Sequence, residues 1–131
     1  MLERLNQLEV NLLELEKFKK KYTLNDLNDE LQLQWSLRYG LLESIQIIID
    51  IACHIVSKYN LANPKSYSDC LRILAKEKYL SNSLSERLEG MAGLRNLLVH
   101  EYFEIDLIRL LRLLDNLDDL RNFSHEVKEH L

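Results

Sequence analysis

Apolar side chains recur every three or four residues along most of the chain, which is the period of one face of an α-helix. The clearest stripe lies near the N-terminus and consists of Leu2, Leu5, Leu8, Leu12, Leu15 and Phe18. Turn-forming residues are rare, with 3 glycines and 1 proline in 131 residues. Long helices with short connections explain both observations. We therefore predict an all-α fold, an antiparallel bundle of four main helices and one short helix that forms a single domain over residues 1–131.

The helix boundaries follow from capping residues and from the proline. We predict helices over Leu2–Lys21, Leu24–Tyr59, Tyr67–Glu77, Leu84–Tyr102 and Leu107–Lys128. Residues that can cap free N–H groups at the helix starts are Thr23 with Asp26, Ser66 with Asp69, Ser83 with Glu86, and Asp106. The second helix must end before Pro64, because proline lacks an N–H and disfavours helical geometry at the preceding residue.

The second half of the second helix, residues 45–56, is apolar nearly all round, so we expect it to be the most buried element. It contains two polar residues, Asp50 and His54, which lie four apart and share a face. They are either supporting groups beside a functional cleft or a buried hydrogen-bonded pair, and the sequence favours neither. Trp35 and Tyr39, earlier on the same helix, are interpreted as packing residues rather than as stacking surfaces for nucleobases.

Charge and cysteine usage limit the possible partners. The formal net charge of −4 argues against a broad phosphate-binding surface, and we expect no DNA partner. Cys53 and Cys70 form no C-x-x-C pair and have no ligands at metal spacing, so we expect reduced core thiols and neither metal nor cofactor. The N-terminal segment is charged throughout and lacks the apolar core of a signal peptide. The longest apolar stretch is too short to span a bilayer, which predicts a cytoplasmic protein without a membrane partner.

The segment RNLLVHEY combines four groups that suit phosphate chemistry: Arg95, Asn96, His100 and Tyr102. On a helix Asn96 and His100 share a face, as do Arg95 and Tyr102, whereas Arg95 and His100 lie about 140° apart. Two glycines precede the segment at positions 90 and 93, and each costs about 1 kcal/mol relative to alanine. We interpret them as room for the close approach of another helix.

These groups match the needs of metal-free RNA cleavage. A base must deprotonate a 2′-hydroxyl and an acid must protonate the leaving oxygen, and histidine can do both near neutral pH. A guanidinium can stabilise the charge that develops on the phosphate. One Arg95 and one His100 per chain are a small set, and a symmetric homodimer would place two of each in one composite cleft.

A purely structural interpretation of the same residues is also open. Arg95 could form a surface pair with Glu89 or Glu101, and His100 could be a partly buried, hydrogen-bonded residue near a helix end. In that case the chain is a helical scaffold. Alanine at both positions would then cost nothing beyond stability.

The motif resembles a known family. GLRNLLVHEY, residues 93–102, resembles the signature of the HEPN superfamily, an arginine followed after four to six residues by a histidine. The fuller pattern Arg-Asn-x3-His-x-Tyr is similar to the HepT toxins of HepT/MntA toxin–antitoxin systems. Residues 38–56 resemble the long helix of that family and residues 63–80 its next helix, so that the similarity covers roughly residues 31–123.

The resemblance implies a role for each motif residue. Arg95 and His100 would be the residues of a metal-independent endoribonuclease, and Asn96 would orient the phosphate or the histidine. Tyr102 would receive AMP from the cognate antitoxin, a MntA-like minimal nucleotidyltransferase. Each AMP adds charge and bulk beside a cleft that must admit a polyanion. The implied protein is the homodimeric toxin of a type VII pair, and its RNA substrate is tRNA or mRNA.

A second functional class stays open at this point. Related bundles act as non-catalytic nucleotide- or substrate-binding subunits of minimal nucleotidyltransferases, in which Arg95 and His100 would bind a phosphate without cleaving it. The complete motif favours the toxin.

Overall fold

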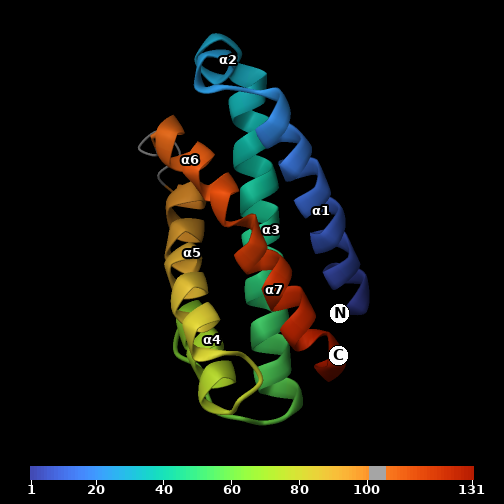
Figure 1. Cartoon of the computed structure of the whole chain (residues 1–131). Helices are drawn as coiled ribbons and strands as arrows, with labels where there is room; N and C mark the ends of the chain where they lie inside the picture. Colours follow the sequence, from blue (N-terminus) through green and yellow to red (C-terminus); the bar gives the residue numbers. More distant parts are fainter. Residues whose placement is uncertain (101–105) are drawn as a thin grey trace.

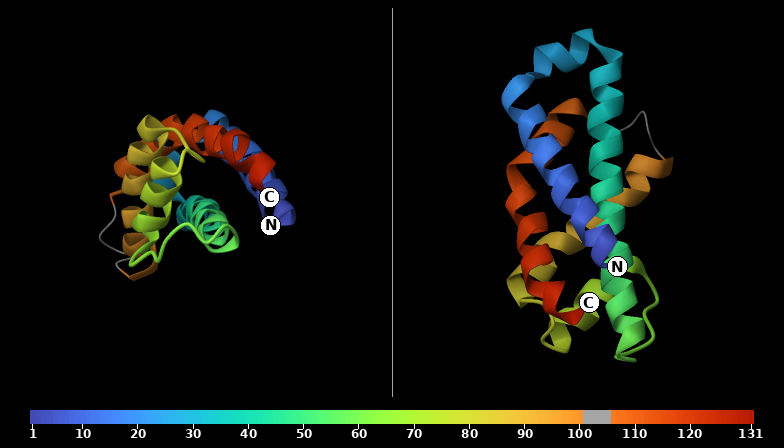
Figure 2. Two further views of the ribbon diagram at one scale, coloured as in Figure 1. Left: turned by 90° about the horizontal axis from the view of Figure 1, so that it is seen from below. Right: turned by 90° about the vertical axis from the view of Figure 1, so that its right-hand side faces the viewer.

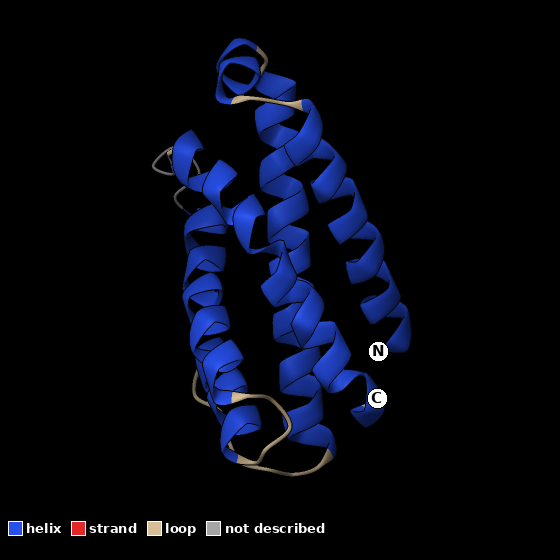
Figure 3. Ribbon diagram, viewed as in Figure 1, coloured by secondary structure: helices blue, strands red, loops and turns tan. Residues whose placement is uncertain are grey.

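The computed structural model describes residues 1–100 and 106–131, and the regular structure in these two segments is helical throughout (Figure 3). The helices are α1 (Leu2–Lys21), α2 (Leu24–Asp29), α3 (Leu31–Lys58), α4 (Tyr67–Lys76), α5 (Asn82–His100), α6 (Leu107–Leu113) and α7 (Leu117–Val127). α1, α3, α5 and the α6–α7 pair alternate in direction, with short α4 packed between α3 and α5 (Figure 1). The two termini lie close together at one end. The predicted all-α antiparallel bundle is confirmed.

Most of the predicted caps start helices. Thr23 forms a capping box with Asp26, the Ser66 hydroxyl accepts from the Asp69 N–H, and the Asp106 carboxylate accepts from the Ile108 N–H. The box at Ser83 is wrong, because α5 already begins at Asn82.

The start of α5 depends instead on a distant residue. The Glu126 carboxylate of α7 accepts from the Ser81 N–H at 2.7 Å, and the Ser81 carbonyl accepts from the Ser85 N–H at 3.0 Å. The first contact is separated by 45 residues in the sequence, and a local pattern cannot reveal it.

The predicted second helix is broken in two. Glu30 adopts an extended conformation (φ −128°, ψ 106°) and separates α2 from α3. Asn28 and Asp29 precede the break, and such side chains favour turns over helix interiors. The Gln34 amide donates to the Leu27 carbonyl at 2.7 Å and satisfies an acceptor near the end of α2. The last predicted helix is likewise interrupted, by a 3-10 turn at Leu114–Asn116.

The second half of α3 is the centre of the core. Ile47, Ile48, Ile49 and Ile51 are all buried, as the apolar stretch predicted. α1 packs on one side of α3, and α4 and α5 pack on the other (Figure 2). By length and composition α3 could cross a membrane, but 56% of its most apolar window is buried inside the bundle.

The first half of α3 differs from the expectation. Trp35 is 51% exposed and Tyr39 is 66% exposed, so their interpretation as packing residues is wrong. Leu31, one turn before Trp35, is also exposed. This end of α3 extends beyond α5, and its outer face therefore presents apolar side chains to solvent.

The close helix approach lies at a different glycine from those expected. A Cβ added at Gly90 or Gly93 would meet no atom within 4 Å, so neither glycine makes room for a neighbouring helix. At Gly40 an added Cβ would lie 3.1 Å from Leu15 Cδ2, which shows that α1 and α3 approach closely there.

The two cysteines are bonded to each other, which corrects the expectation of reduced thiols. Cys53 near the end of α3 and Cys70 in α4 form a disulfide with a Cα–Cα distance of 5.1 Å. The chain reverses between α3 and α4 and brings the two residues opposite each other. Their separation of 17 residues gave no sign of this pairing.

The contact between α1 and α7 predicts a pH dependence of stability. Arg121 Nη2 donates to Glu16 Oε1 at 2.9 Å, and this hydrogen bond and the guanidinium charge hold the pKa of Glu16 below its ordinary value of 4.5. Stability from a carboxylate whose pKa is lowered on folding is present above the unfolded pKa and is lost as the pH falls through the folded one. We expect the free energy of unfolding of Glu16→Gln, measured in urea, to fall less steeply below about pH 4.5 than that of the wild type. Glu14→Gln, whose carboxylate pairs with Lys17 on the same helix, is the control.

Candidate functional site

The guanidinium of Arg95 is held by three neutral groups. Its Nε donates to Gln46 Oε1 of α3 at 2.8 Å, and its Nη1 donates to Asn96 Oδ1 at 3.1 Å. Its central carbon lies 5.3 Å from the ring centroid of Tyr67 at the start of α4, a cation–π distance. In residues 1–100 and 106–131 no salt bridge involves Arg95. The cation is therefore fixed in place, and no direct ion pair neutralises it within that part of the chain.

The surface pair between Arg95 and Glu89 is not formed. Glu89 Oε1 lies 3.2 Å from the Nε of Arg72 on α4. The other expected partner, Glu101, lies outside the described residues.

A chain of polar contacts positions Gln46. Its Nε2 donates to Asp50 Oδ1 at 2.8 Å, and the other oxygen of Asp50 forms an ion pair with Arg4 of α1. The Gln46 amide is thus oriented with its oxygen toward Arg95. Asp50 is thereby linked to Arg95 through Gln46.

His54 has no place in this chain of contacts. It is half-buried, and no hydrogen bond within the described residues joins it to Asp50. The alternative in which Asp50 and His54 form a buried hydrogen-bonded pair is therefore not realised within the described residues.

His100 lies at the end of the described part of α5 and is exposed. It follows Asn96 by one turn on the same helix face, and Asn96 is also exposed. Ideal helix geometry separates Arg95 and His100 by about 7.5 Å along the axis and about 140° around it. The structure thus joins Arg95 to Asn96, whereas His100 shares the helix face of Asn96 and not that of Arg95. Tyr102 lies outside the described residues.

Sequence reasoning missed Gln46, Tyr67 and Arg4. A local signal existed for Gln46, because it lies four residues before Asp50 in a helix that is otherwise apolar there. Tyr67 and Arg4 reach the site from other helices, and nothing in their local sequence marks them.

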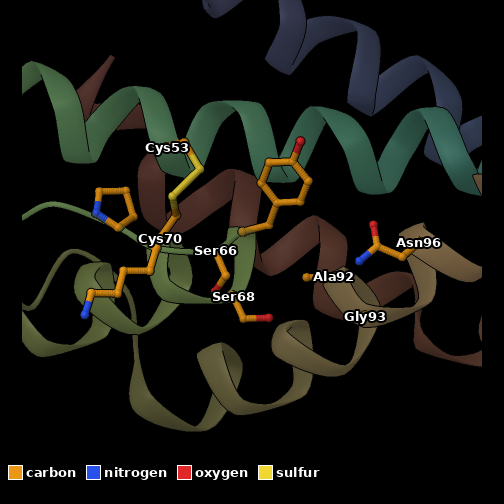
Figure 4. Close-up of a pocket in the computed structure, with 10 residues that line it drawn as sticks. Cys53, Ser66, Ser68, Cys70, Ala92, Gly93 and Asn96 are labelled. Atoms are coloured by element: carbon orange, nitrogen blue, oxygen red, sulfur yellow. A yellow bond between two sulfur atoms is a disulfide. The ribbon is translucent and has the colours of Figure 1, made fainter.

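A pocket of about 490 Å³ lies between α3, α4 and α5 (Figure 4). Its walls are the Cys53–Cys70 disulfide, residues 64–68 at the start of α4, and Ala92, Gly93 and Asn96 of α5. It therefore shares Tyr67 and Asn96 with the surroundings of the guanidinium. No group of three or more His, Cys, Asp and Glu side chains in the described segments is placed to hold a metal ion.

This arrangement suits an anionic ligand. A fixed guanidinium can take a phosphate through two parallel hydrogen bonds, and the amide of Asn96 can add a donor. An exposed imidazole one turn along the helix can exchange protons with the same ligand. The geometry therefore favours a phosphodiester over a neutral substrate.

Comparison with known proteins identifies the family. The sequence matches the family described as Ribonuclease HepT-like over residues 8–127. It is 32% identical over 113 residues to the mRNA nuclease HepT of Shewanella oneidensis, which covers 86% of this chain and 78% of that protein. It is 43% identical over 63 residues to the tRNA nuclease HepT of Aphanizomenon flos-aquae, which covers 47% of this chain and 42% of that one.

Solved structures agree with the sequence match. A tri-AMPylated HEPN toxin of Shewanella oneidensis in complex with an MNT antitoxin superposes with a TM-score of 0.88 at 26% identity, covering 98% of this chain and 96% of that one. A tyrosine-to-alanine mutant of a MntA toxin–antitoxin complex superposes with a TM-score of 0.86 at 25% identity, covering 98% and 97%. Because the family match extends over nearly the whole chain, this protein belongs to the HepT-like ribonucleases, the endoribonuclease toxins of toxin–antitoxin pairs.

Proposed function

We propose that this chain is a cytoplasmic, metal-independent endoribonuclease toxin of a type VII toxin–antitoxin pair. It cleaves tRNA or mRNA at a composite site of a homodimer, with Arg95 and His100 as catalytic residues and Asn96 beside them. The cognate MntA-like nucleotidyltransferase silences it by adding AMP to Tyr102. The observation that carries the proposal is the Arg95 guanidinium, fixed by the neutral Gln46 and Asn96 so that its charge remains for a phosphate.

Two histidines divide the proton transfers. One His100, as neutral imidazole, removes the proton of a ribose 2′-hydroxyl, and the 2′-oxygen attacks the adjacent phosphorus. The bond from phosphorus to the 5′-oxygen breaks, and the second His100, as imidazolium, protonates that oxygen. The products are a 2′,3′-cyclic phosphate and a 5′-hydroxyl. Arg95 stabilises the negative charge that grows on the phosphoryl oxygens in the transition state.

The exposed apolar face of α3 supports the homodimer. Leu31, Trp35 and Tyr39 recur at intervals of four residues and are 55%, 51% and 66% exposed. On α5, Val99 is 41% exposed and precedes His100 directly. A second copy that covers these side chains would remove apolar surface from water and bring two copies of His100 toward one cleft.

The relatives support the RNA substrate and the modification. One is described as an mRNA nuclease and another as a tRNA nuclease. A structural neighbour is described as a tri-AMPylated toxin bound to its MNT antitoxin, and the mutated residue of another is a tyrosine. Tyr102 follows His100 by two residues. Phosphate charge added there would repel RNA from the catalytic histidine.

Alanine substitutions test the catalytic pair. We expect unmodified wild type to cleave total RNA and tRNA in EDTA, and His100→Ala and Arg95→Ala each to lower the rate at least about a hundredfold, because each removes a proton-transfer or charge-stabilising group. His125→Ala, also an exposed histidine, and Arg87→Ala, whose side chain pairs with Asp119, should retain activity. Circular dichroism checks folding. Wild type free of AMP by intact mass that cuts no RNA would contradict the proposal and favour a binding subunit.

Substitutions of Gln46 test whether Arg95 must keep its charge. Gln46→Glu places a carboxylate beside the guanidinium, and we expect KM for RNA to rise on the order of tenfold because an ion pair competes with phosphate. Gln46→Leu removes the hydrogen bond without adding charge, so it should lower kcat more than it raises KM. Equal effects of both variants on KM would argue against the role assigned to the charge.

Silencing should require Tyr102. Incubation with the antitoxin and ATP should add AMP to the wild type, seen by intact mass, and abolish RNA cleavage. Tyr102→Phe keeps the ring but lacks the hydroxyl. It should therefore cleave RNA, receive no AMP, and remain active after incubation with the antitoxin and ATP. Tyr39→Phe, at an exposed tyrosine on α3, serves as the control and should be silenced like the wild type. If Tyr102→Phe receives as much AMP as the wild type, the modified residue is not Tyr102.

A further inference from the structure

The pocket beside Arg95 has a lining of mixed chemistry. One end is formed by the Cys53–Cys70 disulfide and the other by Asn96, with Ser66 and Ser68 between them (Figure 4). At about 490 Å³ it lies within the range of small-ligand sites. Ala92 and Gly93 form an apolar wall on α5. The space can therefore take one flat, partly polar group.

Tyr67 supplies an aromatic surface to this pocket. It is 43% exposed, so that part of its ring is open to a ligand. Stacking on an aromatic side chain binds the four bases with little discrimination, because every base has a π-face. Since Arg95 lies 5.3 Å from the same ring, a ligand on Tyr67 would be adjacent to the guanidinium.

Several hydrogen-bonding groups around Tyr67 are not engaged by the protein. The Lys65 ammonium and the Ser68 hydroxyl make no hydrogen bond within residues 1–100 and 106–131, although the charge of Lys65 helps to lower the pKa of Asp69. Asn96 Oδ1 accepts from Arg95, which leaves its Nδ2 group as the donor for a ligand. Such groups can pair with the edge of a base, and the ammonium can pair with a phosphate oxygen.

The face of α5 that lines the pocket also carries His100, one turn beyond the lining residue Asn96. Gly93, Asn96 and His100 lie at intervals of three and four residues, so they share one helix face. A nucleotide seated in the pocket would thus have its phosphate near Arg95 and Asn96 and the next ribose in the direction of His100.

We infer that this pocket is a base-binding subsite for the RNA nucleotide next to the scissile phosphate, with Tyr67 as its stacking surface and Asn96, Lys65 and Ser68 as its polar contacts. The inference deepens the proposed ribonuclease function and rests on it for the identity of the ligand. The subsite makes Ser68 a specificity-determining residue of the cleavage reaction, with Tyr67 as the stacking surface that holds the base.

A pair of glycine substitutions tests the subsite. A Cβ at Gly93 would meet no atom within 4 Å, so the side chain of Gly93→Leu can enter the pocket without displacing the backbone. Gly90→Leu adds the same side chain three residues earlier, also into open space but outside the pocket lining. Both variants also replace a glycine within α5 by leucine, so changes in helix propensity are matched.

Two measurements are made on the wild type and both variants, each shown free of AMP by intact mass and folded by circular dichroism. The first is the set of cut sites in single-stranded RNA with randomised sequence. The second is binding of the four 3′-nucleoside monophosphates by calorimetry. We expect the wild type to prefer certain bases at one position beside the cut, and Gly93→Leu to lower that preference and the binding by about tenfold. Gly90→Leu should retain the base preference and the nucleotide affinity of the wild type.

The outcomes separate the subsite from the catalytic function. If Gly93→Leu retains the wild-type cut sites and affinities, the subsite is wrong, although ribonuclease activity stands. If the wild type cuts no RNA but binds the nucleotides, and Gly93→Leu loses that binding, the catalytic proposal fails and the pocket remains a nucleotide site. If the wild type neither binds the nucleotides nor prefers any base, the subsite is overturned.

Discussion

The burial of the second half of α3 determines the architecture around it. Ile47 and Ile51 are fully buried in this segment, and each buried side chain of this size contributes about 1.5–3 kcal/mol. α1, α4 and α5 must therefore pack against this segment to cover it. Because α3 is one continuous helix, it fixes the relative positions of the helices that supply Arg4, Tyr67 and Arg95. The candidate site lies beside α3, where α4 and α5 pack against it.

The polar edge of α3 shows how a buried helix can support a charged site. Gln46 and Asp50 lie one turn apart and are half-buried. A carboxylate hydrogen-bonded directly to Arg95 would orient it equally well but would neutralise it. Gln46 instead links Arg95 to the Asp50–Arg4 ion pair through hydrogen bonds. The neutral amide, and not the carboxylate of Asp50, therefore contacts the guanidinium. Orientation and charge are thus set by different residues, which is the arrangement that electrostatic stabilisation of a phosphate requires.

The sequence predicted those features that depend on local pattern. Helical periodicity gave the helices of the bundle, and local caps gave the starts at Thr23, Ser66 and Asp106. Prediction from the sequence failed where a contact between distant residues determines the structure. One example is Ser81, whose N–H donates to Glu126 of α7, and another is the disulfide between Cys53 and Cys70. For the same reason the sequence marked Arg95 and Asn96, which are adjacent in one motif, but not Tyr67, whose ring reaches Arg95 only after α4 folds back onto α5.

The net charge of the chain is negative, which bears on how it can act on a polyanion. With a formal charge of −4, long-range attraction toward RNA is weak, so affinity must come from short-range contacts at the site. One fixed guanidinium, an ammonium at Lys65 and an aromatic surface at Tyr67 are few contacts for one chain. The proposed dimer would double them in one cleft without changing the sequence. In the proposed site one added phosphate group would offset much of the local positive charge, so the proposed modification of Tyr102, two residues after His100 in the sequence, would weaken RNA binding.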